Sequence, residues 1–540
     1  MSTSRRRLTA LVTGPARGPH LVIAFVVLLG ISWVFANPPG YAPDEPAHYS
    51  KALSVGRGVW VAPDADYGIG PGFGPRQLRW INKVATVVHH PPHMAPDRFA
   101  CSIFNPRRTA RCLYEGGPPA EAVPRLTYVG TYEPYLYLPA GLAMRAADDA
   151  FTAVRLGRLA LATISLFLLA LAAAVLWKPH EWGFPLVGLV AATTPMVLFL
   201  SSELAPSGPE VSASICFMAV VLRLARTDPP TARVWVAGGV SGAVLAMSRS
   251  LGPFFLAADL MVLLLIVGPR EAWRKARAGG KAALGAVAAL VFGVTANVAW
   301  GLTVQAHPGL DLTHAWPTVG IAIGELGEIV RQGIGMFGWQ DVAMPRVATN
   351  AWAGMGAALV AVGFVVGQRR QRLTLAAVAV GCVVGTIGMA VFVVQPRVYG
   401  FPLFGRYFLP LWLVLPLVAG EIVFLNRHRL GRLGRALLPV VTVVAATVHL
   451  SGWWTSARRY AVSEKGPTFF LGHSEWAPDG GWAPWVALMV AAVACLVWYG
   501  VGSVGDGDEE GLAMGEAAGA GVRSVALASQ RENVPTGTAP

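Results

Sequence analysis

The chain has 540 residues, of which 54% are hydrophobic and only 14% are charged, and its mean hydropathy is +0.51. A chain this long and this apolar is not one water-soluble domain, so the composition predicts an integral membrane protein. The net charge of +13 and the pI near 9.8 do not indicate a nucleic-acid partner, because the basic residues form short clusters between apolar segments.

The first apolar segment, residues 21–36, follows a basic start that contains Arg5, Arg6 and Arg7. Cleaved signal peptides have the same pattern. We favour an uncleaved first membrane helix, because many further apolar segments follow and the residues after Ala36 make a poor cleavage site. Residues 1–20 are then expected to form a cytoplasmic N-terminus.

An acidic motif, Pro-Asp-Glu-Pro-Ala-His, follows this segment at residues 43–48. If Asp44 caps a short helix, Pro46 is tolerated in its first turn and His48 lies one turn later on the same face. Two carboxylates and an imidazole in this arrangement suit a metal ion or a proton transfer. An ordinary capped helix at the membrane surface is the alternative.

The motif opens a connection, residues 37–150, that is far longer than a usual loop. We expect this loop outside the cytoplasm, where Cys101 and Cys112 would form a disulfide. A zinc site is the weaker interpretation, since paired Cys-x-x-Cys spacing is absent and the loop's histidines lie among prolines. Near its end, Tyr132 and Glu133 are candidates to stack on a sugar or hydrogen-bond to it, although an aromatic belt explains the tyrosine nearly as well.

About twenty apolar residues cross a bilayer, and on this rule the chain contains about twelve membrane helices. Their predicted starts are Leu21, Phe151, Gly183, Gly208, Val234, Gly252, Ala282, Asn350, Leu373, Tyr407, Ala436 and Trp482. The basic clusters fall on alternate connections, at residues 5–7, 178, 223–233, 270–281, 369–372 and 427–435. They indicate the cytoplasmic side and place both termini there. The predicted fold is therefore an all-α polytopic membrane domain over residues 21–502.

Two further long connections, residues 307–349 and 451–484, fall on the opposite side with the first loop. In the first of these, residues 321–334 fit a helix lying in the membrane interface. In the second, Trp453, Trp454 and Trp476 are expected to be interfacial anchors. The Gly- and Ala-rich residues 503–540 are expected to be a disordered cytoplasmic tail.

Arginines occur on this same side, against the usual bias that places basic residues inside. Arg249 lies in a very short turn, and Arg397 and Arg406 precede a late helix that opens with Tyr407. A phosphorylated lipid head group would need such cations, because the planar guanidinium matches phosphate oxygens. Snorkelling to head groups or pairing with a nearby acid is the alternative.

These observations predict one site at the outer ends of the helices. One carboxylate of Asp44 and Glu45 would take a proton from an acceptor hydroxyl while a sugar leaves its lipid phosphate. The other would hold Mg²⁺ or Mn²⁺, unless arginine alone neutralises the phosphate. His48 is first of all a hydrogen-bonding neighbour, with ligand and base as its other roles. The expected substrate-binding residues are His48, Tyr132, Glu133, Arg249, Arg397, Arg406 and Tyr407.

Three motifs carry a resemblance to a known family: the acidic motif at 43–48, Ser-Arg-Ser-Leu-Gly-Pro at 248–253, and Gly-Arg-Tyr-Phe-Leu-Pro at 405–410. Together they resemble a bacterial family of polytopic membrane proteins of unknown function that is grouped with the glycosyltransferase C superfamily. The segment 201–207 departs from the pattern, because Ala205 precedes Pro206 where an asparagine is expected.

The resemblance implies many membrane helices, a long first outer loop, and a multi-pass protein of the cytoplasmic membrane whose active face is extracytoplasmic. It also implies transfer of a sugar from a polyprenyl-phosphate donor to a glycan, lipid or protein acceptor, with Asp44 and Glu45 as base or metal ligand. A flippase for lipid-linked saccharides is one alternative, and it predicts polar groups at mid-membrane and related halves. A non-catalytic scaffold for envelope assembly is the other.

Overall fold

The computed structural model describes residues 17–64, 74–116, 121, 123–179, 181, 183–226, 229–305 and 309–502. Most of these residues are helical. The helices are α2 (Arg17–Ala36), α3 (Glu45–Gly56), α4 (Pro75–Val84), α5 (Tyr137–Met144), α6 (Ala150–Leu176), α7 (Val187–Ala192), α8 (Pro195–Ser201), α9 (Ser207–Ala225), α10 (Ala232–Ser248), α11 (Gly252–Val267), α12 (Pro269–Ala278), α13 (Gly280–Thr303), α14 (Ala315–Gly324), α15 (Leu326–Gly335), α16 (Arg346–Val366), α17 (Arg369–Met389), α18 (Pro396–Tyr399), α19 (Leu409–Trp412), α20 (Val414–Leu425), α21 (Arg432–Val462) and a final helix, Ala483–Gly502. The strands are β1 (Thr86–His90), β2 (Val123–Thr127), β3 (Met336–Phe337) and β4 (Val342–Ala343). The basic residues 5–7 and the predicted tail lie outside the described residues.

Nine of the described helices are long and apolar enough to cross a membrane, or up to eleven if each of two bent pairs is one span. The bent pairs are α7 with α8, at 71°, and α11 with α12, at 102°. Helix α10 has only 17 residues and is therefore shorter than these spans. The predicted starts all fall in or beside helices, but the predicted number of about twelve spans is not reached by these criteria.

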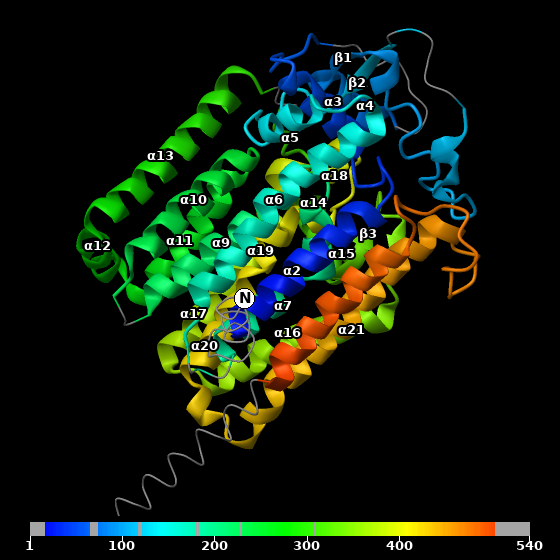
Figure 1. Ribbon diagram of the computed structural model, residues 1–540. Helices are drawn as coiled ribbons and strands as arrows, with labels where there is room; N and C mark the ends of the chain where they lie inside the picture. The colour runs from blue at the N-terminus through cyan, green and yellow to red at the C-terminus, as the bar shows by residue number, and fades with distance from the viewer. Residues whose placement is uncertain are drawn as a thin grey trace, which may run out of the picture.

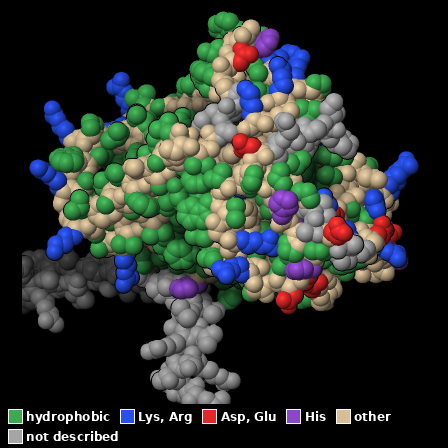
Figure 2. All heavy atoms as spheres, turned by 90° about the horizontal axis from the view of Figure 1, so that it is seen from above, with side chains coloured by type: hydrophobic (Ala, Val, Ile, Leu, Met, Phe, Trp, Pro, Cys, Tyr) green, Lys and Arg blue, Asp and Glu red, His purple; other side chains and the backbone are tan. Residues whose placement is uncertain are grey.

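The long helices run alongside one another, and most of the first loop folds over one end of the bundle (Figure 1). Helices α3, α4 and α5 and strands β1 and β2 lie together at this end, whereas the basic helix α12 lies at the opposite end of α13. Figure 2 looks down on the first-loop end, where hydrophobic side chains cover a broad area and charged ones lie both among them and at the edge. We refer to the described residues between 45 and 144, which form the part of the first loop at this end, as the cap.

Backbone pairing and close packing hold the cap in place. Strands β1 and β2 are antiparallel, with Thr86 opposite Thr127, and the Thr127 hydroxyl donates to the carbonyl of Ala47 in α3 at 2.9 Å. Helices α3 and α5 approach so closely that a Cβ on Gly56 would lie 2.3 Å from the carbonyl oxygen of Gly141. Only glycine permits this contact, so a larger residue at position 56 would push α3 away from α5.

Two expectations for the other long connections are wrong. The interval 321–334 is not one interfacial helix, because α14 ends at Gly324 and α15 begins at Leu326 on the other side of Glu325. Helix α15 also buries Ile329 and Ile334 against neighbouring helices. Trp453 and Trp476 are only 0% and 3% exposed, so they are core residues that pack around Trp482 and not surface anchors.

Cys101 and Cys112 form a disulfide in the first loop. The same segment is tied to α21 by Arg459, whose guanidinium donates to the carbonyl oxygens of Ser102, Asn105 and Arg108 at 2.8–3.0 Å. The segment is therefore fixed both by a covalent link and by a distant helix.

We expect the double change Cys101→Ser and Cys112→Ser to destabilise this part of the first loop by about 3 kcal/mol, because the 11-residue closure restricts the unfolded chain. Limited proteolysis of the purified protein would measure the loss as faster cleavage within residues 101–116. Cys495→Ser, in the final helix, is the matched control and should leave this cleavage unchanged. Equal cleavage rates for the double variant and the wild type would contradict the prediction.

Candidate functional site

Asp44 lies at the start of α3, where φ is 62° and ψ is 10°. Aspartate is one of the few residues that tolerate this left-handed backbone conformation. Asp44 is the N-cap residue of this short helix, as expected, but its side chain makes no capping hydrogen bond. Instead, Oδ1 accepts a hydrogen bond from the Tyr128 hydroxyl at 2.7 Å and Oδ2 accepts one from Arg406 Nη2 at 2.8 Å. Asp44 thus joins the cap to the segment that precedes α19.

Glu45, the adjacent carboxylate, points into a separate buried network. It is 0% exposed and accepts hydrogen bonds from Arg158 of α6 at 2.6 and 2.7 Å, as well as from the backbone N–H groups of Gly40 and Leu204. Although burial opposes ionisation, Arg158 holds the pKa of Glu45 below its usual value. The two carboxylates of the acidic motif therefore do not converge on one site.

Arg158 is the centre of this buried network, and sequence analysis missed it. Besides Glu45 it contacts Glu203 at 3.0 Å and donates to the carbonyl oxygens of Val34, Asn37 and Pro38. Burial and the nearby Glu45 raise the pKa of Glu203, so one arginine faces one ionised carboxylate. The sequence did contain a signal for this residue, because an arginine two turns into an apolar membrane helix is unusual.

Two predicted arginines meet at Tyr407. The Arg406 guanidinium lies 5.0 Å from the centre of the Tyr407 ring, and that of Arg249 lies 5.8 Å from the same centre. Arg249 also lies 5.7 Å from the centre of the Tyr132 ring. Cation–π contacts at these distances hold a guanidinium without occupying its N–H donors.

The two arginines differ in how firmly they are paired. Arg406 is 8% exposed and bound to Asp44, whose side chain is 28% exposed. Arg249 is 26% exposed, and its ion pair with Glu210 of α9 is long, at 3.7 Å. The backbone carbonyl of Arg249 accepts from Asn297 of α13, which fixes the turn. Arg249 thus has donors that remain accessible to an anion.

His48 lies one turn into α3, beside this group. Its Nδ1 is 2.7 Å from the Tyr137 hydroxyl. Burial lowers the pKa of His48 to about 4, with Arg249 and Arg406 acting in the same direction against Asp44. His48 is therefore neutral at physiological pH and is placed as a hydrogen-bonding neighbour.

Glu133 lies in the cap, in the turn that precedes α5, and is 1% exposed. Its Oε1 is buried and has no hydrogen-bond partner. Burial raises the pKa of Glu133 to about 7, while its own backbone N–H, Arg249 and Lys51 oppose this and Glu210 adds to it. Lys51, which sequence analysis also missed, donates to the carbonyl oxygens of Trp60 and Gly130.

Arg397 does not join this group. It is exposed in α18, and its backbone carbonyl accepts a hydrogen bond from Arg76 of α4. The site residues that the structure brings together are therefore Asp44, His48, Tyr132, Glu133, Arg249, Arg406 and Tyr407, together with the unpredicted Lys51 and Tyr128. We refer to these nine residues as the arginine–tyrosine cluster.

The cluster does not fit the expected divalent cation. Mg²⁺ and Mn²⁺ prefer several oxygen ligands, but both oxygens of Asp44 are already bound and Glu45 faces Arg158. Within the described ranges, no group of three or more His, Cys, Asp or Glu side chains is arranged to hold a metal ion. The positive charge at the cluster comes from arginine and lysine.

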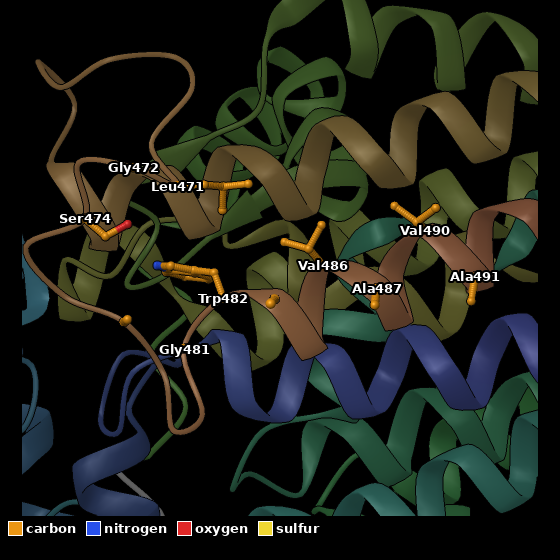
Figure 3. Close-up of a pocket in the computed structure, with 11 residues that line it drawn as sticks. Leu471, Gly472, Ser474, Gly481, Trp482, Val486, Ala487, Val490 and Ala491 are labelled. Carbon is orange, nitrogen blue, oxygen red and sulfur yellow. The ribbon is translucent and has the colours of Figure 1, made fainter.

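A separate hollow of about 900 Å³ lies where the last connection meets the final helix (Figure 3). Leu471 and Trp482 line it from the connection, and Val486 and Val490 line it from the helix. None of its described lining residues belongs to the arginine–tyrosine cluster. This hollow is largely apolar and is separate from the charged residues of the arginine–tyrosine cluster.

Comparison with known proteins gives one match. A family model described as "Predicted membrane protein (DUF2142)" matches residues 27–415, which include the acidic motif, Arg249 and Arg406. No curated protein and no solved structure matches the chain.

Proposed function

The chain belongs to the DUF2142 family of predicted membrane proteins, and from this premise we propose that it is a glycosyltransferase. In this proposal it transfers a sugar from a polyprenyl-phosphate donor to a glycan, lipid or protein acceptor of the cell envelope. The proposed reaction takes place at the outer face of the cytoplasmic membrane, and the proposal puts the cap on that side. The grouping with the glycosyltransferase C superfamily is part of the same proposal.

One observation carries the proposal: Arg249 and Arg406 share the Tyr407 ring at one end of a bundle of apolar helices. A lipid-linked phosphate would have its chain in the bilayer and its head group at this level. Two guanidinium groups would neutralise the charge that develops on the phosphate as the sugar leaves. Because they are partly shielded from water, their attraction for the phosphate would be stronger than at an exposed surface.

The difference in pairing suggests a division of work between the two arginines. Arg249, with its long contact to Glu210, would bind the donor phosphate first. Arg406 would then contribute one face of its guanidinium while Asp44 fixes its position. Tyr132 and Tyr407 would hold both cations and offer flat surfaces for a sugar ring.

The proposal predicts that Arg249→Gln and Arg406→Gln each weaken binding of a synthetic polyprenyl phosphate by about 10- to 100-fold, because each removes charged hydrogen bonds. Native mass spectrometry of the full-length protein in detergent would measure the affinity. In cells, both variants should lose one envelope glycan.

Arg346→Gln, an exposed arginine at the start of α16, is the matched control and should bind polyprenyl phosphate as the wild type does. Unchanged affinity in both cluster variants, together with an unchanged set of envelope glycans, would contradict the proposal.

One observation favours transport of lipid-linked saccharides instead. Asp259 lies in the middle of α11, is 1% exposed, and has an Oδ2 without a hydrogen-bond partner. Buried acids within membrane helices commonly mark ion or solute paths. Flipping of a lipid-linked saccharide by reconstituted protein, lost in Asp259→Asn and without any transfer product, would establish this second function.

A further inference from the structure

We propose that Glu133, and not the acidic motif, is the proton acceptor of the reaction. This inference rests on the proposed glycosyl transfer. It assigns Asp44 the role of a positioning residue that acts through Arg406.

Asp44 is poorly suited to accept a proton. Its two oxygens are already engaged by the Tyr128 hydroxyl and by Arg406, so a substrate hydroxyl would have to displace one of these partners. A neighbouring arginine also favours the ionised form and makes a carboxylate a weaker base. Glu45 is excluded on stronger grounds, since Arg158 and the backbone N–H groups of Gly40 and Leu204 already occupy both of its oxygens.

Glu133 has the features that Asp44 lacks. Its Oε1 is buried and unpartnered, so a hydroxyl can donate to it without breaking an existing hydrogen bond. Leaving such an oxygen without a partner is unfavourable, and a bound hydroxyl would remove this cost. The vacant acceptor therefore favours a ligand that brings a donor to this position.

The charged groups around Glu133 come from three directions. Lys51 reaches it from α3, Arg249 from the turn after α10, and Glu210 from α9. Burial raises the pKa of Glu133 to about 7, and Glu210 adds to this effect. A base works best when its pKa lies close to the working pH, so this carboxylate is suited to neutral conditions.

Arg249 connects the proposed proton acceptor with the proposed phosphate site. Its charge lowers the pKa of Glu133, and it shares the Tyr407 ring with Arg406. In the proposed step the acceptor oxygen forms a bond to the anomeric carbon. The bond from that carbon to the phosphate oxygen breaks, and its electron pair stays on the phosphate beside the arginines. The hydroxyl proton passes to Glu133 Oε1, so charge and atoms balance.

The test uses membrane vesicles from cells that produce the full-length wild type, Glu133→Gln or Glu133→Asp. Mass spectrometry would follow conversion of polyprenyl-phosphate-linked sugars to free polyprenyl phosphate. We expect Glu133→Gln to lower the rate at least 100-fold while its affinity for polyprenyl phosphate and its melting temperature stay close to those of the wild type. Glu133→Asp should retain part of the rate.

The pH profile separates a base from a purely structural residue. The wild-type rate should rise with pH and level off above about 7, because Glu133 must lose its proton before it can accept another. Glu115→Gln, which removes an exposed carboxylate of the same loop, should keep this profile.

The outcomes distinguish the two claims. If wild-type vesicles convert the donor and Glu133→Gln converts it at the same rate with the same pH profile, the assignment of Glu133 is wrong and the proposed function stands. If wild-type and protein-free vesicles give equal conversion, the proposed function fails and the inference fails with it.

Discussion

Replacing Arg158 by methionine is expected to destabilise the folded protein by about 3–5 kcal/mol, because it leaves a buried charge without a partner. Arg158 is 0% exposed and supports Glu45 and Glu203 as well as three backbone carbonyls at the end of α2. Thermal unfolding of the purified protein in mild detergent would measure the loss as a lower midpoint.

A matched control lies three residues earlier in the same helix. Arg155 pairs with Asp479 at the surface, where the side chains are 22% and 54% exposed. Arg155→Met should cost no more than about 1 kcal/mol, as exposed ion pairs usually do. Adding Glu45→Gln to Arg158→Met should recover part of the stability, because the stranded negative charge is then removed. Equal midpoints for Arg155→Met and Arg158→Met would show that the buried network is not stabilising.

Under the proposed function, replacing Asp44 by alanine is expected to lower glycosyl transfer by about 100-fold, because Arg406 would lose the partner that orients it toward the donor phosphate. The Tyr128 hydroxyl would lose its acceptor at the same time. Conversion of polyprenyl-phosphate-linked sugars in membrane vesicles would measure the rate.

A double-mutant cycle tests whether Asp44 acts through Arg406. If it does, Asp44→Ala with Arg406→Ala should be no slower than Arg406→Ala alone, since the two effects are not independent. The pH profile of any residual activity should stay that of the wild type, because the proton acceptor is still present. A loss in the double variant equal to the product of the two single losses would contradict the positioning role.

The sequence was sufficient for the class of fold and for several members of the cluster. Long apolar segments predict membrane helices by length alone, and nine to eleven such helices are present in the described chain. Arg249, Arg406 and Asp44 were predicted because charge at the ends of spans on one side of the membrane must meet at one end of a bundle. Tyr132 and Tyr407 could be predicted because they adjoin charged residues in the same turns.

Other features of the cluster depend on backbone direction and could not be predicted. Asp44 and Glu45 are adjacent, yet the left-handed conformation at Asp44 sends one carboxylate toward α19 and the other toward α6. Lys51 looks like an ordinary surface lysine in sequence, but the rest of the cap folds over it and leaves it only 2% exposed. Arg397 and Arg406 both precede the same late helix in the sequence. Arg397 is nevertheless exposed, because it lies in the separate short helix α18, whose backbone is bound by Arg76 of α4.

Asp44 and Glu45, the N-cap residue and the first residue of α3, are attached to different segments of the bundle. Glu45 is anchored to α6 by hydrogen bonds from Arg158 in the buried interior, whereas Asp44, whose side chain is 28% exposed, is held by the Arg406 guanidinium and the Tyr128 hydroxyl. In the proposed reaction, Asp44 would keep Arg406 in place while the donor phosphate binds the free face of its guanidinium, and the backbone that carries both acids would stay fixed. Because Glu45 is fixed to α6, small rotations of the Asp44 and Arg406 side chains would suffice when the phosphate binds, and the main chain would need little reorganisation.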